Sequence, residues 1–463
     1  MSELALAGRV VELVRRAAGP AAEAEVVASH AAEALTRFAN SAIHQNVADA
    51  TTTVRLRLHL EGRTASGSTT RTDSDGLQAL VERTIAAARL SPPDTAWPGL
   101  TPPTALHPYE ELDEATARAT PEERAARVRD FVAAAGGLET AGYCRTNYAS
   151  AAFANTAGQA VEGRFAEAAM DGIARVDGAD GVARLASGRL AELDGAVLGA
   201  RAAAKARAGG KPIELPPGRY EVILEPDAVA DVLGNMAAFG FNGKSFAQRQ
   251  SFAELGAQQF DSSVTLFDDP IGGLGAPAPG LPFDTEGTPR ATLALVREGT
   301  TVGVTHDRSS AAEVGAVSTG HASPASRGWG PYGSHLRLAP GPATRLVDGP
   351  DNSPTAESSR ALVANLERGL LITDFWYTRV LDQKSLVITG LTRNGVWLVE
   401  NGEVTAAVSN MRFTQSYPQA LGPGAVRGIG AEATMLPDRW SGVRYTAPAI
   451  HLTSWNLTGN ASG

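Results

Sequence analysis

Residues 209–218 read GGKPIELPPG and divide the chain into halves of different character. Three glycines and three prolines in ten residues interrupt any regular helix or strand, so this stretch predicts a domain boundary. The sequence after it is mostly strand and turn, as in residues 384–410, KSLVITGLTRNGVWLVENGEVTAAVSN. Helical and strand patterns are mixed in the sequence before it. The expected fold class is therefore α+β, with an N-terminal α/β region followed by a β-rich C-terminal domain.

The first hundred residues combine two helical patterns with a strand pattern. Apolar residues recur at helical spacing from Leu6 to Ala17 and again from Leu77 to Ala88. Between them, residues 54–60 alternate apolar and polar side chains, which is typical of a half-buried hairpin strand. Residues 91–112 then contain six prolines and predict a linker or surface crossing. We therefore expect a first α+β domain over residues 1–90.

A second α+β domain is expected over residues 113–208. Thr120 precedes Pro121 and is followed by Glu123, a capping-box pattern that predicts the start of a helix. Strand-like segments follow at about 141–155 and 158–191, and an alanine-rich helix is expected from Asp194 to about Ala208. The third domain is expected over residues 218–463.

Composition excludes several classes of protein. The 463-residue chain has 41 basic and 50 acidic side chains, a net charge of −9, and no cluster of Lys and Arg, so nucleic acid is not an expected partner. The single cysteine, Cys144, cannot form an internal disulfide, which favours a reducing cytoplasm. No apolar stretch of membrane-spanning length and no signal peptide are recognised, so we expect a cytoplasmic protein that does not bind membranes.

Local motifs do not identify an active site. No two of the eight histidines are spaced i,i+4, so no local zinc motif is present. Ser318 lies in a sequence close to a nucleophile elbow, but its spacing supplies no His and Asp to orient it, so an ordinary turn is the better interpretation. The acidic set Asp268, Asp269, Asp284, Glu286, His306 and Asp307 leaves two readings open: a site for a hard cation, or turns whose acids bond their own backbone.

The order of longer segments from residue 218 onward resembles the TldD/TldE family, whose TldE side is also called PmbA, modulator of DNA gyrase. The segments, in family order, are VILEPDAVADVLGNMAAFGFNGKSFAQRQSF, SSVTLFDDP, FDTEGTPRATLALVREGTTVGVTHDR, STGHASP, ITGLTRNGVWLVENGEVTAAVSNMRFTQS and PAIHLTSWNLTG. The N-terminal helix, hairpin and helix also fit the family. The resemblance therefore implies the TldD/PmbA fold for nearly the whole chain.

The resemblance also implies that this chain lacks the family's metal site. In the TldD partner, a helix carries HExxxH and a cysteine near the C-terminus completes the zinc ligands. The two histidine positions fall here on Gly234 and Phe239, the Glu position on Asn235, and the cysteine position on Thr434. Glycine and phenylalanine have no side-chain donor atom, and a lone threonine hydroxyl is a poor zinc ligand. No cofactor is expected in this chain.

The function implied by the resemblance is that of a TldE-like subunit without catalytic residues. It would belong to a heteromeric zinc metallopeptidase that cleaves short or unfolded peptides, with zinc carried by a TldD-like partner. The alternative is a homodimeric peptide-binding or scaffold protein of the same fold with no role in proteolysis. Whether the chain itself is an enzyme stays open.

Contacts to substrate or partner are expected where the resemblance is densest, at Asp284, Glu286, His306, Asp307 and Arg308. These residues flank the segment ATLALVREGTTVGVTH, whose centre carries Gly299. Because glycine can take the positive φ of a tight turn, the segment predicts a hairpin that brings its ends together. Glu286 and Asp307 would then lie near each other. The competing interpretation is that they only fix the turns.

Overall fold

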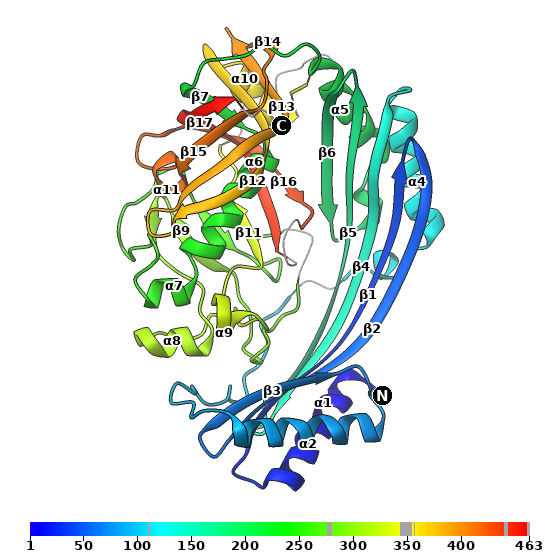
Figure 1. The fold of residues 1–463 in the computed structure, drawn as a ribbon, viewed down its shortest axis with the longest axis vertical. Helices are drawn as coiled ribbons and strands as arrows, with labels where there is room; N and C mark the ends of the chain where they lie inside the picture. The colour runs from blue at the N-terminus through cyan, green and yellow to red at the C-terminus, as the bar shows by residue number, and fades with distance from the viewer. Residues whose placement is uncertain (110–111, 276–279, 343–353, 356, 439–442, 461–463) are drawn as a thin grey trace.

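The computed structural model describes residues 1–109, 112–275, 280–342, 354–355, 357–438 and 443–460, and all structural statements below concern these residues. It consists of an N-terminal half built on one long curved sheet and a C-terminal half built on a second sheet (Figure 1). The α+β class and the β-rich C-terminal half are confirmed.

The N-terminal sheet has six antiparallel strands in the order β3-β2-β1-β4-β5-β6. Residues 1–90 and 113–208 therefore contribute to a single sheet, in which β1 pairs with β4 over residues 25–38 and 142–155. The division of this half into two folding domains stays a prediction. The strands are β1 (Glu23–Ala39), β2 (Ala42–Leu60), β3 (Arg63–Thr69), β4 (Glu139–Asn155), β5 (Ala160–Val176) and β6 (Ala179–Ser187).

Helices cover one face of this sheet at its two ends. Ala24 of β1 packs in a core with α1 (Glu3–Ala18) and α2 (Ser74–Leu90), whereas Phe38 packs in a core with α4 (Pro121–Ala134) and α5 (Gly195–Ala208). Side chains an even number of positions apart on a strand share a face, so both pairs of helices lie on the same side. The opposite face is turned toward the C-terminal half. Short helical turns complete this half at α3 (Glu114–Ala117) and Leu190–Glu192.

Most of the expected N-terminal elements are confirmed. Thr120 caps α4 through the predicted capping box with Glu123. The two helical patterns and the strand at 54–60 lie in α1, α2 and β2. Strand β1 was not predicted, because EAEVVASHAAEALTRFA is rich in alanine and glutamate and has no clean apolar alternation.

The C-terminal half is an eleven-stranded mixed sheet that surrounds α6 (Pro226–Asn235) and its π-helical extension Met236–Gly240. Its core contains a cluster of aromatic rings in which Phe375 and Trp455 stack at 5.0 Å between centroids. The strands are β7 (Gly218–Leu224), β8 (Leu266–Asp268), β9 (Leu293–Arg297), β10 (Thr300–Thr301), β11 (His335–Leu338), β12 (Arg368–Asp382), β13 (Val387–Glu400), β14 (Glu403–Ala407), β15 (Met411–Ser416), β16 (Val426–Leu436) and β17 (Arg444–Asn460). The remaining helices are α7 (Gly243–Ala247), α8 (Arg308–Val314), α9 (Ser326–Trp329), α10 (Glu357–Val363) and α11 (Tyr417–Ala420).

Buried ion pairs join the two halves. Lys205 of α5 lies 2.5 Å from Glu225, and Arg184 of β6 lies 2.7 Å from Asp227 and 2.9 Å from Asp374. The carboxylates Asp171, Asp374 and Asp227 hold the pKa of Arg184 well above its usual value even though burial opposes its charge. Because removing one partner would leave a buried charge, these pairs fix the position of the N-terminal sheet against the C-terminal half.

Within the described ranges, every helix is too short or too polar to cross a lipid bilayer.

Candidate functional site

The predicted hairpin is present and brings the two dense segments of the family resemblance together. Strands β9 and β10 pair antiparallel, with Thr300 opposite Arg297. Glu298 and Gly299 occupy the turn with φ values of 45° and 80°. Both central residues of a type I′ turn have positive φ, and such turns match the twist of antiparallel strands. The loop of residues 284–289 and the segment of residues 306–308 therefore meet at one place.

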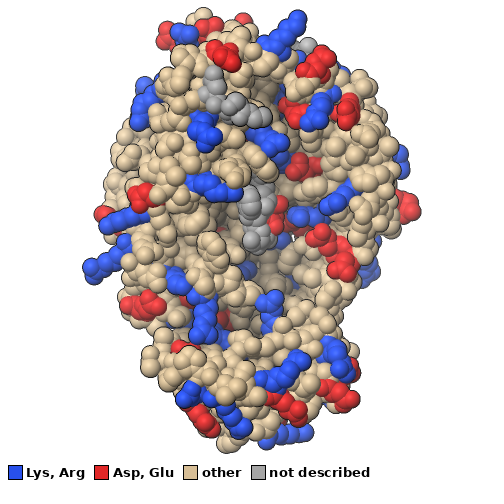
Figure 2. All heavy atoms as spheres, in the orientation of Figure 1, with Lys and Arg blue, Asp and Glu red and all other residues tan. Residues whose placement is uncertain are grey.

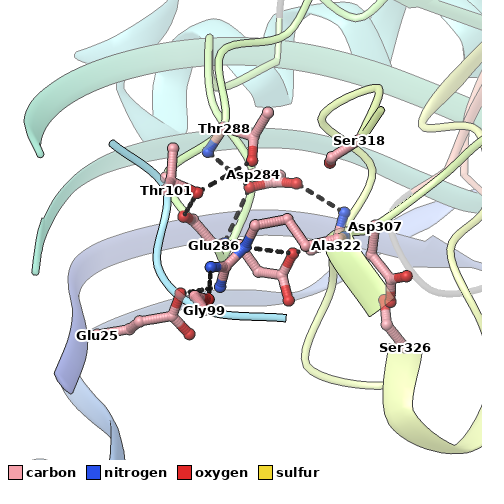
Figure 3. Close-up of polar contacts among 12 residues, drawn as sticks. Glu25, Gly99, Thr101, Asp284, Glu286, Thr288, Asp307, Ser318, Ala322 and Ser326 are labelled. Carbon is pink, nitrogen blue, oxygen red and sulfur yellow. Dashed lines mark hydrogen bonds and ion pairs between the residues drawn. The ribbon is translucent and has the colours of Figure 1, made fainter. Parts of the chain in front are cut away.

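Asp284 organises the loop that carries Glu286. One carboxylate oxygen accepts hydrogen bonds from the backbone N–H groups of Glu286 at 2.9 Å and Thr288 at 3.0 Å. The other oxygen accepts the N–H of Ala322 at 2.9 Å (Figure 3). Burial and the neighbouring Glu286 raise the pKa of Asp284 to about 6. Its geometry is that of an acid that fixes a turn.

Glu286 lies at the centre of a buried ion cluster that joins both halves. Its Oε2 accepts the backbone N–H of Arg308 at 3.0 Å and the Nε–H of the same residue at 3.2 Å. Its Oε1 lies 2.9 Å from Nη1 of Arg57 on β2. The Arg308 guanidinium also contacts the carboxylate of Glu25 on β1 and the carbonyl of Gly99 (Figure 3). We call Glu25, Arg57, Glu286 and Arg308 the junction cluster.

Trp97 and Thr101, in the segment expected to be a linker or surface crossing, pack against the junction cluster. Trp97 lies under the Arg57 guanidinium, with 4.6 Å from Cζ to the ring centroid, and stacks on His59 at 4.8 Å. Thr101 donates its hydroxyl hydrogen to the carbonyl of Glu286 at 2.7 Å. Part of this proline-rich segment is thus packed between the two halves and contributes to the site.

The junction cluster contains equal numbers of acidic and basic side chains, and its two acidic side chains are strongly desolvated. Two carboxylates face two guanidinium groups, and the Glu25 and Glu286 side chains are only 2% and 6% exposed. Burial raises the pKa of Glu25 to about 8, although Arg308 and Arg57 oppose the shift. A proton taken up or lost at Glu25 would therefore change the balance of charge at the contact between the halves.

Asp307 and His306 are held by local contacts. Asp307 caps α8, since its carboxylate accepts the N–H of Ser310 at 2.7 Å. The His306 ring lies 3.1 Å from the Ser310 hydroxyl, and burial lowers the pKa of His306. All five residues expected to contact substrate or partner are thus near one another, and Glu286 and Arg308 touch directly. Their contact with substrate or partner stays a prediction.

A serine nucleophile is not supported by the contacts of Ser318. Its hydroxyl lies 3.3 Å from the carbonyl of His306, and the described structure gives it no contact with a histidine ring. A His–Asp pair does lie nearby, with Nε2 of His321 2.7 Å from Asp268, but the other ring nitrogen contacts Thr319. Because the Thr319 hydroxyl also accepts the His306 N–H at 2.7 Å, this arrangement joins two loops.

The positions at which the resemblance predicts two zinc-binding histidines and the catalytic Glu carry groups that do not suit a metal site. Asn235 donates its side-chain N–H to the backbone carbonyl of Asp231 at 2.9 Å. A Cβ at Gly234 would lie 2.9 Å from the Tyr445 hydroxyl, and Phe239 packs against the hydrophobic core. Within the described ranges no three His, Cys, Asp or Glu side chains are placed to hold a metal ion, and this includes the acidic set considered as a cation site.

Sequence reasoning missed Glu25, Arg57 and Trp97. Glu25 is 283 residues from Arg308 in the sequence, and Arg57 is 229 residues from Glu286. Trp97 is about 200 residues from Arg308. One sequence pattern indicates such a contact. Arg55 and Arg57 alternate with apolar residues in β2, so the polar face of that strand lies opposite the face that packs on the helices. The sequence could not identify that partner.

Comparison with known protein families identifies the class of protein that has this fold. Residues 217–459 match the family model described as PmbA/TldA metallopeptidase C-terminal domain, and residues 24–88 match PmbA/TldA metallopeptidase domain 1. The first match covers more than half of the sequence, and the chain belongs to the PmbA/TldD family.

Solved structures with the same fold include TldE from Thermococcus kodakarensis, with a TM-score of 0.85, 16% identity and coverage of 98% of this chain and 100% of that chain. A candidate modulator of a DNA gyrase from Thermotoga maritima matches with a TM-score of 0.80, 17% identity and coverage of 98% and 99%. A candidate modulator of DNA gyrase from Bacteroides thetaiotaomicron gives 0.79, 17% and 98% of both chains. No curated protein sequence matches significantly. The resemblance found in the sequence is therefore confirmed.

Proposed function

We propose that this chain is the TldE-like subunit of a heteromeric zinc metallopeptidase and contributes no catalytic residue of its own. The TldD-like partner would carry zinc, and the substrates would be short or unfolded peptides in the cytoplasm. Membership of a metallopeptidase family provides the reaction class. The missing ligand groups support placing the catalytic zinc on another chain.

The observation that carries this proposal is the packing of residues 234–239. A catalytic zinc site needs three side-chain ligands around an open position. Here the α6 helix passes into a π-helical turn, and the residues at the ligand positions either lack donor atoms or pack into the core. Gly234 faces the buried Tyr445, which leaves no room for an imidazole at that position.

The contribution of this chain would be to complete the enclosure in which a peptide is held. Figure 2 shows a hollow between the two halves, with charged side chains along both of its sides. The buried ion pairs at Arg184 and Lys205, together with the junction cluster, support a fixed spacing between the walls of this hollow. A wall of constant shape suits the positioning of a flexible substrate because the protein then loses little entropy on binding.

The test is to purify the chain alone and with a TldD-like partner produced in the same cells. We expect no peptide cleavage by the isolated chain and chelator-sensitive cleavage by the complex. Thr434→Ala serves as the matched variant, since a residue without a metal role at the family cysteine position should leave cleavage by the complex unchanged. Chelator-resistant cleavage by the isolated chain would contradict the proposal. A chain that ignores the partner would favour the homodimeric scaffold.

A further inference from the structure

A pocket of about 360 Å³ lies where the β5–β6 turn of the N-terminal half meets strand β13 of the C-terminal half. Its walls come from the start of β6, the residues that follow α5, and strands β12, β13 and β15. Figure 1 shows β13 beside the upper end of β6, and the two strands are in contact. The volume is within the range of roughly 300–1,000 Å³ that is usual for small-molecule sites. The pocket can therefore hold a small ligand, and its lining includes no residue of the junction cluster.

An interruption of the sheet makes room for the pocket. Strand β15 pairs with β13 over residues 387–391 of β13, and β14 pairs with it over residues 397–400. Residues 392–395 of β13 therefore have no paired residue on that side among the described strands. The Thr392 hydroxyl takes the place of one such pairing, since it accepts the N–H of Met411 at 2.9 Å. The rest of this stretch lines the pocket instead of pairing with a neighbouring strand.

The backbone beside the pocket is distorted. The register of β12 against β13 shifts on both sides of the paired residues Phe375 and Thr392. Tyr377 and Asn394 have positive φ values, 53° and 58°. A positive φ is unusual for a bulky side chain, and both bulges and strained residues gather at functional sites. The distortion is an observation independent of the pocket's volume, and it also points to a ligand site.

Two arginine side chains give the pocket a positive charge. The Arg393 guanidinium lies over the Trp376 ring, with 4.8 Å from Cζ to the ring centroid. Within the described part of the chain, no ion pair joins Arg393 or Arg412 to a carboxylate. Asp180, the acidic residue in the lining, already accepts two hydrogen bonds from Arg175, at 2.6 and 2.9 Å. The pocket therefore presents two guanidinium groups that an anion can bind.

Apolar side chains lie beside these charges. Leu391, Val396 and Val408 line the pocket together with the Trp376 ring. Val396 and Val408 are buried and belong to the core, so this wall has a fixed shape. Guanidinium groups next to an apolar wall suit a ligand in which a carboxylate is attached to an apolar group. A free phosphate ion would contact the arginines but leave the apolar wall unused.

We propose that this pocket binds the C-terminal end of a peptide. The terminal carboxylate lies on Arg393 and Arg412, and the last side chain packs against Trp376 and the apolar wall. A guanidinium group suits this carboxylate because it donates two parallel hydrogen bonds in a planar geometry. The unpaired strand residues 392–395 offer backbone hydrogen bonds to the peptide. The choice of a peptide over other carboxylic acids rests on the proposed function, whereas the site itself needs only this chain.

The first experiment measures peptide binding to the purified full-length chain by isothermal titration calorimetry. The probe is acetyl-Ala-Ala-Ala-Leu with a free carboxylate, and its C-terminal amide is the matched ligand because it lacks only the negative charge. We expect saturable binding of the free acid and binding of the amide that is weaker by about tenfold or more. Equal binding of the two peptides, or no binding of the free acid, would overturn the proposal.

Substitutions then locate the carboxylate. Arg393→Gln and Arg412→Gln should each weaken binding of the free acid by about tenfold and leave binding of the amide unchanged. Both arginines are exposed, so these variants should fold. Arg379→Gln is the matched control, since Arg379 is exposed and lies over the Tyr377 ring at 4.2 Å but does not line the pocket. The same loss in the control variant would contradict the assignment of the site.

Competition tests the nature of the ligand. Acetyl-Ala-Asp-Ala-Leu amide carries an internal carboxylate in place of the terminal one, and we expect it to bind as weakly as the other amide. Tight binding of this peptide, or its equal in inorganic phosphate displacing the free acid at the same concentration, would show a general anion site and refute the proposal. These measurements use the isolated chain without zinc. A complex that cleaves no peptide would therefore contradict the proposed function without changing the outcome expected here.

Discussion

Individual residues of the candidate site divide into those with local partners and those with distant ones. Asp284 and Asp307 bond backbone groups within four residues, apart from the Asp284 contact to Ala322. Such acids can be recognised in a sequence because their partners are adjacent. The main partner of Glu25 is the guanidinium group of Arg308, which is 283 residues away in the sequence. The residues that flank Glu25 resemble those around any strand residue. Tertiary contact alone gives Glu25 its unusual environment.

Glu25 predicts a pH dependence that one substitution should remove. Its folded pKa of about 8 is above the ordinary value of 4.5, so the folded state holds a proton that the unfolded state releases between these pH values. Its contribution to stability is complete below about pH 4.5 and is lost as the pH rises to about 8, by up to about 1.4 kcal/mol per pH unit. Glu25→Gln should abolish this slope.

The measurement is chemical unfolding of wild type and Glu25→Gln between pH 5 and 9. The difference between the two proteins is the quantity of interest, because other titrating groups cancel in it. We expect the stability of wild type relative to the variant to fall up to about pH 8 and then to level off. Parallel profiles across the whole range would show that Glu25 is ionised in the folded protein at neutral pH.

Asp307 should act on the stability of α8. Asp307→Ala removes the carboxylate that accepts the Ser310 N–H, and loss of such a cap costs about 1 kcal/mol. Asp307→Asn retains an acceptor and should cost less. Both variants should bind the TldD-like partner normally at temperatures where they remain folded. Reduced cleavage by a fully folded Asp307→Ala complex would instead support a role for Asp307 toward the substrate.

Among the helices, strands and turns, the predictable ones are those fixed by interactions between residues that are close in the sequence. The cap at Thr120 and the turn at Gly299 depend on neighbouring residues, and both are present as expected. Strand β1 has no such signal and is defined by its pairing with β2 on one side and β4 on the other. The segment 91–112 was expected to be a linker or surface crossing because prolines exclude regular structure. The Thr101 hydroxyl nevertheless donates to the carbonyl of Glu286, and the Thr104 N–H donates to the side chain of Gln159. A segment without helices or strands can therefore still be tightly packed.

The turn of the β9–β10 hairpin should not tolerate a side chain at Gly299. Gly299 has φ of 80°, and a Cβ there would lie 2.2 Å from the Gln258 side chain and 2.4 Å from the Phe260 carbonyl. Gly299→Ala should therefore cost more than the roughly 1 kcal/mol expected from positive φ alone. Gly315→Ala is the matched control, because Gly315 has φ of 68° and nothing within 4 Å of the added Cβ. Equal losses in thermal unfolding would show that the hairpin relaxes around the methyl group.

In the whole molecule, the sequence predicted which kinds of secondary structure each half contains, but not the contacts between the two halves. The glycine- and proline-rich residues 209–218 do separate α5 from β7, as their composition indicated. The halves are nevertheless joined by buried charges on Arg184, Lys205 and the junction cluster, whose partners come from distant parts of the chain. A buried ion pair satisfies its charges only in one geometry, so these contacts favour a single arrangement of the two halves.

The metal content of the purified chain tests whether it holds a zinc site. The purified chain should contain well under one zinc per molecule by elemental analysis, because Gly234, Phe239 and Thr434 supply no adequate ligand set. Restoring the family motif with Gly234→His/Asn235→Glu/Phe239→His should not create a tight site, since a side chain at 234 would meet the buried Tyr445 hydroxyl. Stoichiometric zinc in the wild-type chain would refute the non-catalytic assignment. Zinc bound only by the triple variant would show instead that α6 and β17 can separate, and would leave the assignment of the natural chain intact.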